Sequence, residues 1–476
     1  KVSKMRTLRR YLAENYTSGP LAMQVTKHIE QRLSIQAKLE EHDVPALKLL
    51  SRDLRAELLF GMCRSGLQGH PLFRLWIHID LACVQRLCGE AVSTRYLLAQ
   101  DEVFRGGAEG VAAFIVSHGS LMYTLENFTD QSDPDHCLRR DSTTGVGAGT
   151  WVSEAALWVE WTHTGRLESI AESRMFAIDV QQMPKLLFHP VLRRTATEYA
   201  QLFHRRVVSA RPPLAQYPSD LVVPHTGYCE LVCAMSRDVQ AQIGLQALRH
   251  ADPWMSMSKR ARLEEEIAAG RSVVVVTGEG SVRRAVSIVA LRLFNSVGSL
   301  LARIGKISDA GCEPDCELPG TKQETGETVG DSLERLVASK LKLANRIEWN
   351  DIRKSRSESA NLNAHSIEAE VTEMKSRALG ICTRYLRKTC SATLKEGEAI
   401  DAPSVSYRSA GDSVAPRFTF KFPDLLQRSV WAVPRAHDFD QGTWECYAWL
   451  SQEEFAYLTG GVRGESMLAH WLSLLV

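Results

Sequence analysis

The chain has no long hydrophobic run and no excess of charge of either sign. Its most apolar stretch, Val273 to Leu301, contains one glutamate and three arginines, so it lacks the roughly 18 consecutive apolar residues that a membrane helix needs. The formal net charge of +1 gives no general attraction to nucleic acid or to an anionic membrane surface. We therefore expect a chain that is soluble by itself and has no nucleic-acid partner.

Cysteine is present, but without a secretory signal or a regular spacing. The 11 cysteines are an odd number, and reduced thiols in a cytosolic setting are the simplest interpretation. Two Cys-x3-Cys pairs, Cys229/Cys233 and Cys312/Cys316, offer thiolates for zinc. Structural zinc sites show tighter paired spacing, so we expect no metal site.

Changes in periodicity indicate the domain organisation. A chain of 476 residues with 44% hydrophobic content is long enough for two or three domains. The spacing of its apolar residues is helical at first and is then typical of short strands between turns. A proline-containing linker follows near residue 210. We expect an α+β fold with a helical segment at 1–75, a strand-rich domain at 76–207, a linker and helix at 208–270 and a last domain at 271–476.

The first segment reads as several short amphipathic helices. Leu21, Val25 and Ile29 recur at four-residue spacing, the segment 17–20 supplies cap and turn residues before them, and Ser51 is the expected N-cap of a third helix. Helices without a core of their own must dock on neighbours or on other subunits. The residues alone therefore predict a docking or dimerisation segment.

The segment from Gly147 to Leu157 indicates an anion site among the strands. A glycine-containing turn that leads into a short helix presents backbone N–H groups to a phosphate. Glu154 is placed to accept from ribose hydroxyls, and Arg166, twelve residues later, suits a ring phosphate. The structural alternative stays open, because acidic residues are common in first helical turns and arginines are common at strand edges.

Glycine, glutamate and arginine in this order resemble the phosphate-binding cassette of cyclic-nucleotide-binding domains. The resemblance in order and spacing covers about 130 residues, a typical domain length, and implies an antiparallel β-roll with flanking helices. No cofactor is implied, but cAMP or cGMP is the ligand if binding is retained. The ligand-binding residues would then be Gly149, Trp151, Val152, Ser153, Glu154, Ala155, Arg166 and Leu167.

Three features depart from that family. Ser153 stands where the cassette usually has glycine, and Glu168 stands where a small residue is favoured. A second negative charge about 4 Å from a phosphate would cost about 4 kcal/mol at an effective dielectric near 20, unless it points away on its strand. The loop from Trp158 to Gly165 is longer than usual and is expected to cover or fill the cleft. Ether-à-go-go-like potassium channels resemble this arrangement.

The helical lead-in resembles the C-linker of voltage-gated and cyclic-nucleotide-gated channels. The resemblance rests on the residue patterns of Val44–Leu58 and of Gly69–Trp76. In the second of these, Pro-Leu-Phe marks the beginning of the nucleotide-binding domain in that family. It implies a homotetramer joined through the C-linker, a membrane pore domain upstream of Lys1, and a position on the cytoplasmic face of a membrane, the plasma membrane in most such channels. Gating would pass through the C-linker as a rigid-body movement.

A soluble regulatory subunit of a cyclic-nucleotide-dependent kinase is a rival interpretation. It would need two tandem rolls, and the sequence contains one. The segment Arg139–Ser142 has the pattern of a basophilic kinase site, although an exposed polar turn is the favoured interpretation.

Residues 271–476 resemble a degenerate Nudix domain, an α/β/α fold. Leu318-Pro-Gly320, then Gly326-Glu327, and Arg335 eight residues later match the loop-helix that holds magnesium against a nucleoside diphosphate. Trp444–Phe455 resembles the closing strand and helix of that family.

In the Nudix family, glutamates after the arginine bind the metal through hard oxygen ligands. This chain has Leu336, Ser339 and Lys340 at those places, and a lysine repels a cation. We therefore expect no enzyme here. The alternative, a soluble cyclic-nucleotide-regulated Nudix-type hydrolase, predicts magnesium-dependent diphosphate hydrolysis.

Overall fold

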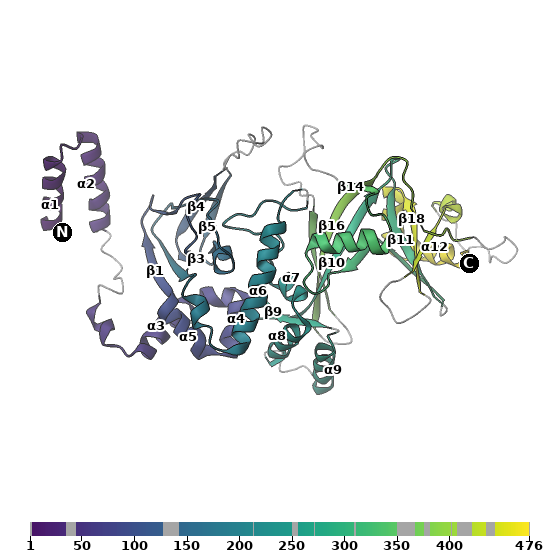
Figure 1. The fold of residues 1–476 in the computed structure, drawn as a ribbon, viewed down its shortest axis with the longest axis horizontal. Coiled ribbons are helices and arrows are strands. Elements are labelled where there is room, and N and C mark those ends of the chain that lie inside the picture. Colours follow the sequence, from purple (N-terminus) through teal and green to yellow (C-terminus); the bar gives the residue numbers. More distant parts are fainter. Residues whose placement is uncertain are drawn as a thin grey trace. The chain divides into compact units, whose positions relative to one another are not determined.

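The computed structural model shows a mixed fold of helices and strands. It describes residues 2–34, 44–126, 142–212, 214–249, 256–270, 272–308, 311–349, 367–375, 381–400, 402–406, 421–434 and 443–475, so residues 139–141 of the kinase-site pattern lie outside it. Within these ranges there are twelve α-helices and eighteen β-strands (Figure 1). The chain divides into two compact units, Lys1–Gly69 with Asp80–His189, and His70–Ile79 with Pro190–Val476.

The helices of the first unit follow the expected pattern. Helices α1 (Val2–Glu14) and α2 (Gly19–Ser34) are separated by the expected turn and joined by an ion pair of 3.1 Å between Arg9 and Glu30. In α3 (Arg52–Gly69), the N–H of Leu54 donates to Ser51 Oγ at 3.3 Å, which confirms the expected cap. Helix α5 (Leu81–Ala91) lies against α3.

Eight short antiparallel strands of the first unit form two four-stranded sheets, in the orders β1-β8-β3-β6 and β2-β7-β4-β5. They are β1 (Val92–Leu97), β2 (Glu102–Phe104), β3 (Ala112–His118), β4 (Ser120–Leu125), β5 (Thr143–Gly147), β6 (Trp151–Val152), β7 (Gly165–Ser169) and β8 (Ser173–Asp179). Burial alternates along β7, as in a strand with one face in a core. The arrangement is compatible with the expected β-roll.

The sequence after the strands predicts one helix from Met183 to Val207, and this prediction is wrong at its start. A 3-10 turn, η5 (Met183–Leu186), ends before α6 (Pro190–Ser209) begins. Proline disfavours helical geometry in the residue before it and is well suited to the first helical position. Pro190 therefore sets the beginning of α6.

The second unit is built around a ten-stranded curled sheet with the path β14-β16-β10-β11-β18-β17. Its strands are β9 (Val273–Val276), β10 (Val282–Phe294), β11 (Leu300–Ser308), β12 (Gly311–Glu317), β13 (Gly320–Lys322), β14 (Ile347–Trp349), β15 (Ile367–Lys375), β16 (Cys382–Leu394), β17 (Trp431–Pro434) and β18 (Trp444–Leu450). Strands β10 and β16 are parallel. The turn residues Asn295–Gly298 predict a hairpin between two apolar strands, and β10 and β11 confirm it, with Phe294 paired with Leu300.

The helices of this unit are α4 (Pro71–Ile79), α6, α7 (Tyr228–Ala234), α8 (Arg237–Arg249), α9 (Met257–Ala268), α10 (Val329–Arg335), α11 (Gln452–Thr459) and α12 (Gly461–Ser473). Helices α7 and α8 occupy part of the segment read from the sequence as a linker. The closing strand and helix are present as β18 and α11.

The strand β15 was not expected, because the sequence reads as a polar stretch there. All its residues after Ile367 are exposed, so it lacks the alternation that marks a half-buried strand. It pairs with β16 along its whole length.

The two faces of the sheet pack against different helices. On one face, Ala302 and Ile304 of β11 and Ala448 of β18 join the core formed with α12 around the fully buried Trp471. On the other face, Leu301 and Tyr447 belong to a core formed with the residues that follow α10. Successive side chains of a strand point to opposite faces, so Arg303 and Glu445 lie on the α10 side.

Candidate functional site

The cassette of the first unit has the expected turn and a short 3-10 helix. Gly149 has φ 86° between β5 and β6, and Ser153 has φ 54° immediately before η4 (Glu154–Leu157). Both values lie in the left-handed region that favours glycine. Ser153 therefore adopts, at some conformational cost, a left-handed backbone conformation that glycine adopts more readily.

The glutamate and the arginine of the cassette both have partners inside the chain. Glu154 Oε1 accepts a hydrogen bond of 3.0 Å from Trp158 Nε1. Arg166 Nη2 lies 3.1 Å from Glu168 Oε2, and the two side chains are 41% and 34% exposed. Arg166 and Glu168 are two residues apart on β7, so they share a face. Glu168 thus supplies the negative charge that a ring phosphate would otherwise bring to Arg166.

The loop from Trp158 to Gly165 is packed against the strands of the first unit. Trp158 and Trp161 are 8% and 7% exposed. The Gly110 N–H donates to the Trp161 carbonyl at 2.7 Å, and His163 stacks on Phe104 with ring centroids 3.8 Å apart. These aromatic side chains are therefore packed against the strands of the first unit.

The other residues predicted to bind a ligand are mostly parts of the core. Val152, Ser153, Ala155 and Leu167 are each at most 2% exposed. Trp151 Nε1 donates to the Gly66 carbonyl of α3 at 3.3 Å. The sequence did not reveal Trp158 as the partner of Glu154, although its position four residues later in a helical turn is compatible with such a contact.

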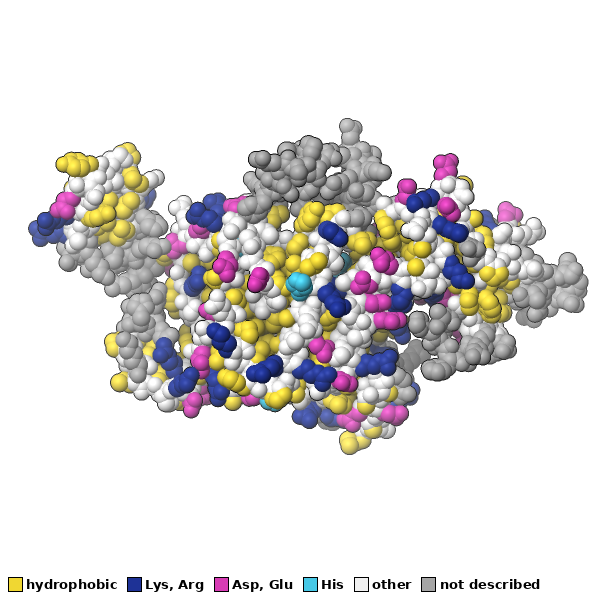
Figure 2. Space-filling model, viewed as in Figure 1, with side chains coloured by type: hydrophobic (Ala, Val, Ile, Leu, Met, Phe, Trp, Pro, Cys, Tyr) yellow, Lys and Arg dark blue, Asp and Glu magenta, His cyan; other side chains and the backbone are white. Residues whose placement is uncertain are grey.

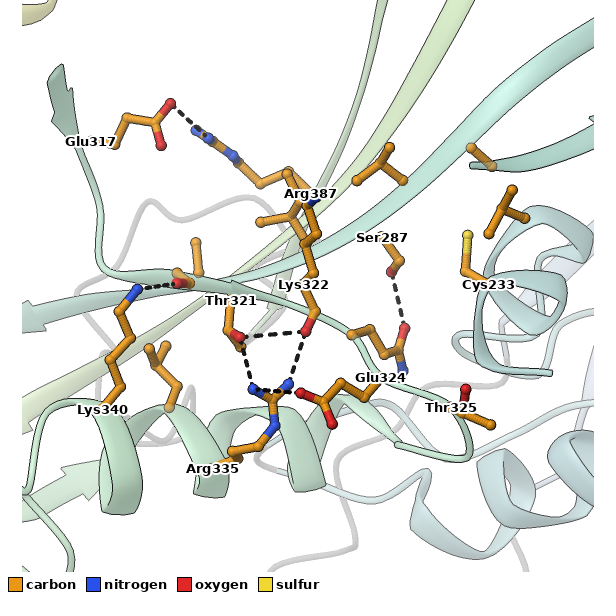
Figure 3. Close-up of a pocket in the computed structure, with 18 of the residues that line it drawn as sticks. Cys233, Ser287, Glu317, Thr321, Lys322, Glu324, Thr325, Arg335, Lys340 and Arg387 are labelled. Carbon is orange, nitrogen blue, oxygen red and sulfur yellow. Dashed lines mark hydrogen bonds and ion pairs between the residues drawn. The ribbon is translucent and has the colours of Figure 1, made fainter. Parts of the chain in front are cut away.

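A second candidate site is a cavity of about 970 Å³ in the second unit (Figure 3). It lies beside β10, β13 and α10, where the Nudix-like loop-helix was expected. A capping box of Thr328 and Asp331 begins α10. Arg335 at its end donates to Glu327 from Nε at 2.6 Å and from Nη2 at 2.9 Å, and to Thr321 Oγ1 at 2.9 Å. Glu327 and Arg335, which are eight residues apart, therefore form a bidentate ion pair.

This ion pair acts on the carboxylate of Glu327. Burial opposes ionisation of the carboxyl group, but the hydrogen bonds from Arg335 and from Ser332 lower its pKa below the ordinary value of 4.5. Glu327 is therefore an ionised structural partner that holds the loop before α10 to the end of the helix.

The places of the expected metal ligands hold groups that do not fit magnesium. Leu336 is fully buried in the core. Lys340 ends the π-helical turn Leu336–Lys340, and its Nζ lies 3.0 Å from the Gly320 carbonyl and 2.8 Å from Glu445 Oε2. A fixed ammonium, a leucine and a serine do not provide the carboxylate oxygens that magnesium prefers.

Glu445 is the buried counter-charge of this ammonium. Its side chain is 4% exposed, and it accepts a hydrogen bond of 2.6 Å from Tyr447 and lies 3.6 Å from Arg303. Burial works against ionisation, but Lys340, Tyr447 and Arg303 lower the pKa of Glu445 below 4.5. Lys340, which stands at a place where a metal-binding carboxylate was considered, is thus part of an internal ion-pair network with Glu445 and Arg303.

The two cysteine pairs lie on separate elements. Cys229 and Cys233 are buried on α7, whereas Cys312 is exposed on β12. Burial raises the pKa of Cys233 to about 12, which disfavours the thiolate form that zinc requires. Across the parts of the chain that the structure describes, no three His, Cys, Asp or Glu residues are grouped as metal ligands.

No described helix has both the length and the apolar character needed to cross a membrane. No protein-family model matches the chain, and no curated protein matches its sequence.

Proposed function

We propose that this chain is the cytosolic regulatory region of a tetrameric voltage-gated potassium or cation channel, held at the cytoplasmic face of a membrane. The observation that carries the proposal is the sequence of elements in the first unit. A helical lead-in precedes eight antiparallel strands, and a glycine turn, a short helix with Glu154, and Arg166 follow one another between β5 and β7.

In this proposal the roll transmits force without a cyclic nucleotide. Glu154 and Arg166 already have partners in Trp158 and Glu168, and the aromatic loop is buried within the roll. A roll stabilised in this way acts as a rigid body that moves with the helices attached to it. The nucleotide-dependent version of the proposal would require both Glu168 and the Trp158 indole to give up these contacts.

Apolar side chains on the lead-in helices support assembly through this segment. Figure 2 shows hydrophobic side chains on the surface of the α1–α2 pair. In this pair Tyr11 and Met23 are 62% and 73% exposed. On α3, the side chains of Leu54, Leu58 and Met62 are 55%, 42% and 37% exposed. The last three are spaced four residues apart, so they form one stripe on the helix. Such stripes are characteristic of helices that pack against another chain.

Sedimentation of the whole chain tests the assembly. We expect a concentration-dependent tetramer that Leu54→Asp with Leu58→Asp disrupts. Val462→Asp is the matched control, because Val462 of α12 is 79% exposed and lies outside the lead-in. A monomer at all concentrations, or equal disruption by the control, would remove the support for assembly through the lead-in.

The alternative of a Nudix-type hydrolase is not favoured. Lys340 and Glu445 form an internal ion pair where that activity needs metal-binding carboxylates. Magnesium-dependent release of phosphate or of a nucleoside monophosphate from a nucleoside diphosphate derivative would reverse this conclusion.

A further inference from the structure

Arg206, in the last turn of α6, is a buried arginine without a partner among the described residues. It is 1% exposed. Its Nε, Nη1 and Nη2 atoms make no hydrogen bond within the described ranges, and no carboxylate there lies within ion-pair distance of them. A guanidinium stays protonated in proteins and has five N–H donors. A full charge and all of its donors are therefore withdrawn from water, which is unfavourable unless a counter-charge is present.

The carboxylates that act on Arg206 are already engaged elsewhere. Burial lowers the pKa of Arg206, and Glu230 and Asp331 are the carboxylates that oppose this effect. Glu230 of α7 accepts a hydrogen bond from Nζ of Lys388, whose side chain is 2% exposed. Asp331 is exposed in the capping box of α10, so water and salt screen its charge. The buried groups are thus two cations and one carboxylate, which leaves one positive charge without compensation.

His225 is a further basic residue of this cluster. It lies between α6 and α7, and its Nε2 atom is buried without a hydrogen-bond partner among the described residues. Burial, and then the charges of Lys388 and Arg206, lower the pKa of the imidazole to about 3. The ring is therefore neutral at pH 7 and supplies no negative charge to Arg206.

The end of α6 is fixed against its neighbours. Arg205 Nη1 donates to the Gly326 carbonyl at 2.8 Å, and the Gly326 N–H donates to the Ala234 carbonyl of α7 at 2.7 Å. The pair of Glu230 and Lys388 joins α7 to β16. Arg206 is thus part of a packed region of the second unit rather than of a free helix end.

The burial of Arg206 restricts what can neutralise it. A side chain with 1% exposure offers no surface to a peptide or to a nucleotide. Water can accept hydrogen bonds from the guanidinium but brings no charge. A small monovalent anion accepts from several N–H groups and supplies the one missing negative charge, whereas a dianion would reverse the imbalance.

We propose that the second unit holds one small monovalent inorganic anion, of the size of chloride, against the guanidinium of Arg206. The anion is a structural ligand, because the packing of α6, α7 and β16 that buries Arg206 exists only in the folded chain, and a ligand of the folded state stabilises it. Neither Arg206 nor its neighbours Glu230, His225 and Lys388 line the cavity beside α10. The proposal is also independent of the proposed channel function.

Thermal unfolding of the whole chain at constant ionic strength tests the proposal, with sodium gluconate replaced stepwise by sodium chloride. We expect a saturable rise of about 3 °C or more in the unfolding temperature of the second unit. Arg206→Met should abolish the rise. Arg193→Met is the matched control and should retain it, because Arg193 is an exposed arginine of the same helix.

His225→Asp keeps the proposal testable if Arg206→Met does not fold. Aspartate tolerates the φ of 63° at this position and adds a carboxylate to the cluster, so the unfolding temperature should no longer depend on chloride. A parent chain with equal unfolding temperatures in gluconate and in chloride would overturn the proposal and assign water to Arg206. A full chloride effect in Arg206→Met or in His225→Asp would also overturn it, since the anion would then bind elsewhere.

Discussion

The Nζ atom of Lys340 lies 2.8 Å from Oε2 of Glu445, a carboxylate whose side chain is 4% exposed. The pair joins the end of the π-helical turn to strand β18, which is 105 residues away. Because Arg303 and Tyr447 also face Glu445, the buried negative charge has three partners. This network gives Lys340 a structural role at a place where a magnesium-dependent hydrolase of the Nudix type would need a metal-binding carboxylate.

Replacing Lys340 by methionine should destabilise the second unit. The variant leaves Glu445 buried with a weaker set of partners, and breaking a buried pair costs about 3–5 kcal/mol when no partner remains. Arg303 and Tyr447 remain, so we expect a loss of about 1–3 kcal/mol in the free energy of unfolding, measured by urea denaturation. The double variant with Glu445→Gln should recover part of it. A single variant as stable as the parent would show that the pair contributes nothing.

His225 should make the stability of the second unit depend on pH. Burial, and then the charges of Lys388 and Arg206, lower its pKa from 6.5 to about 3. Between these values the unfolded chain binds a proton that the folded chain does not. Stability therefore falls as the pH decreases below 6.5, by up to about 1.4 kcal/mol per pH unit from this group.

Denaturation with urea at several pH values measures this dependence. In His225→Asn the slope between pH 6.5 and 4.5 should decrease by about one proton, and asparagine tolerates the φ of 63° at this position. His204→Asn is the control, because His204 is exposed on α6. An unchanged slope in His225→Asn would be evidence against a neutral imidazole in the folded protein.

Gly110→Ala should destabilise the roll. A Cβ atom there would lie 3.0 Å from Trp161 Cδ1 and 3.1 Å from the Trp161 carbonyl oxygen. Overpacking of this kind costs about 1–3 kcal/mol, so thermal unfolding of the first unit should occur at a lower temperature. Gly147→Ala is the matched control, since nothing lies within 4 Å of its added Cβ. Equal effects would mean that the loop with Trp161 is not fixed against Gly110.

Glu168→Ala should reveal whether the cassette retains a latent site. The Arg166–Glu168 pair is partly exposed, so its loss should change stability by less than about 1 kcal/mol. Combined with Trp158→Phe, it removes both the Arg166–Glu168 and the Trp158–Glu154 contacts, and a cyclic nucleotide should then bind with measurable heat. Binding should disappear again when Arg166→Ala is added. No heat from Glu168→Ala with Trp158→Phe would mean that the buried loop, and not these two contacts, closes the site.

Much of the local structure follows from periodicity and cap residues. Ser51 caps α3, and the β10–β11 hairpin has the predicted position, because caps and turns depend on neighbouring residues. The Arg335–Glu327 contact is also predictable, since both ends of the pair belong to one short loop-helix. For the same reason, the common face of Arg166 and Glu168 follows from their spacing on a strand.

Other features depend on contacts between distant segments. Lys388 of β16 is buried and pairs with Glu230 of α7, and nothing in either local sequence indicates the other. The cavity beside α10 arises in the same way, because strands and helices that are distant in sequence line it. Strand β15 is exposed and shows no alternation of buried and exposed residues. Its pairing with β16 is therefore what makes this segment a strand.

Calorimetric titration of the whole chain with cAMP and cGMP tests the central claim most directly. The internal partners of Glu154 and Arg166 predict no binding heat at millimolar ligand. Saturable binding of either nucleotide, abolished by Arg166→Ala, would contradict the account and identify the roll as a nucleotide receptor.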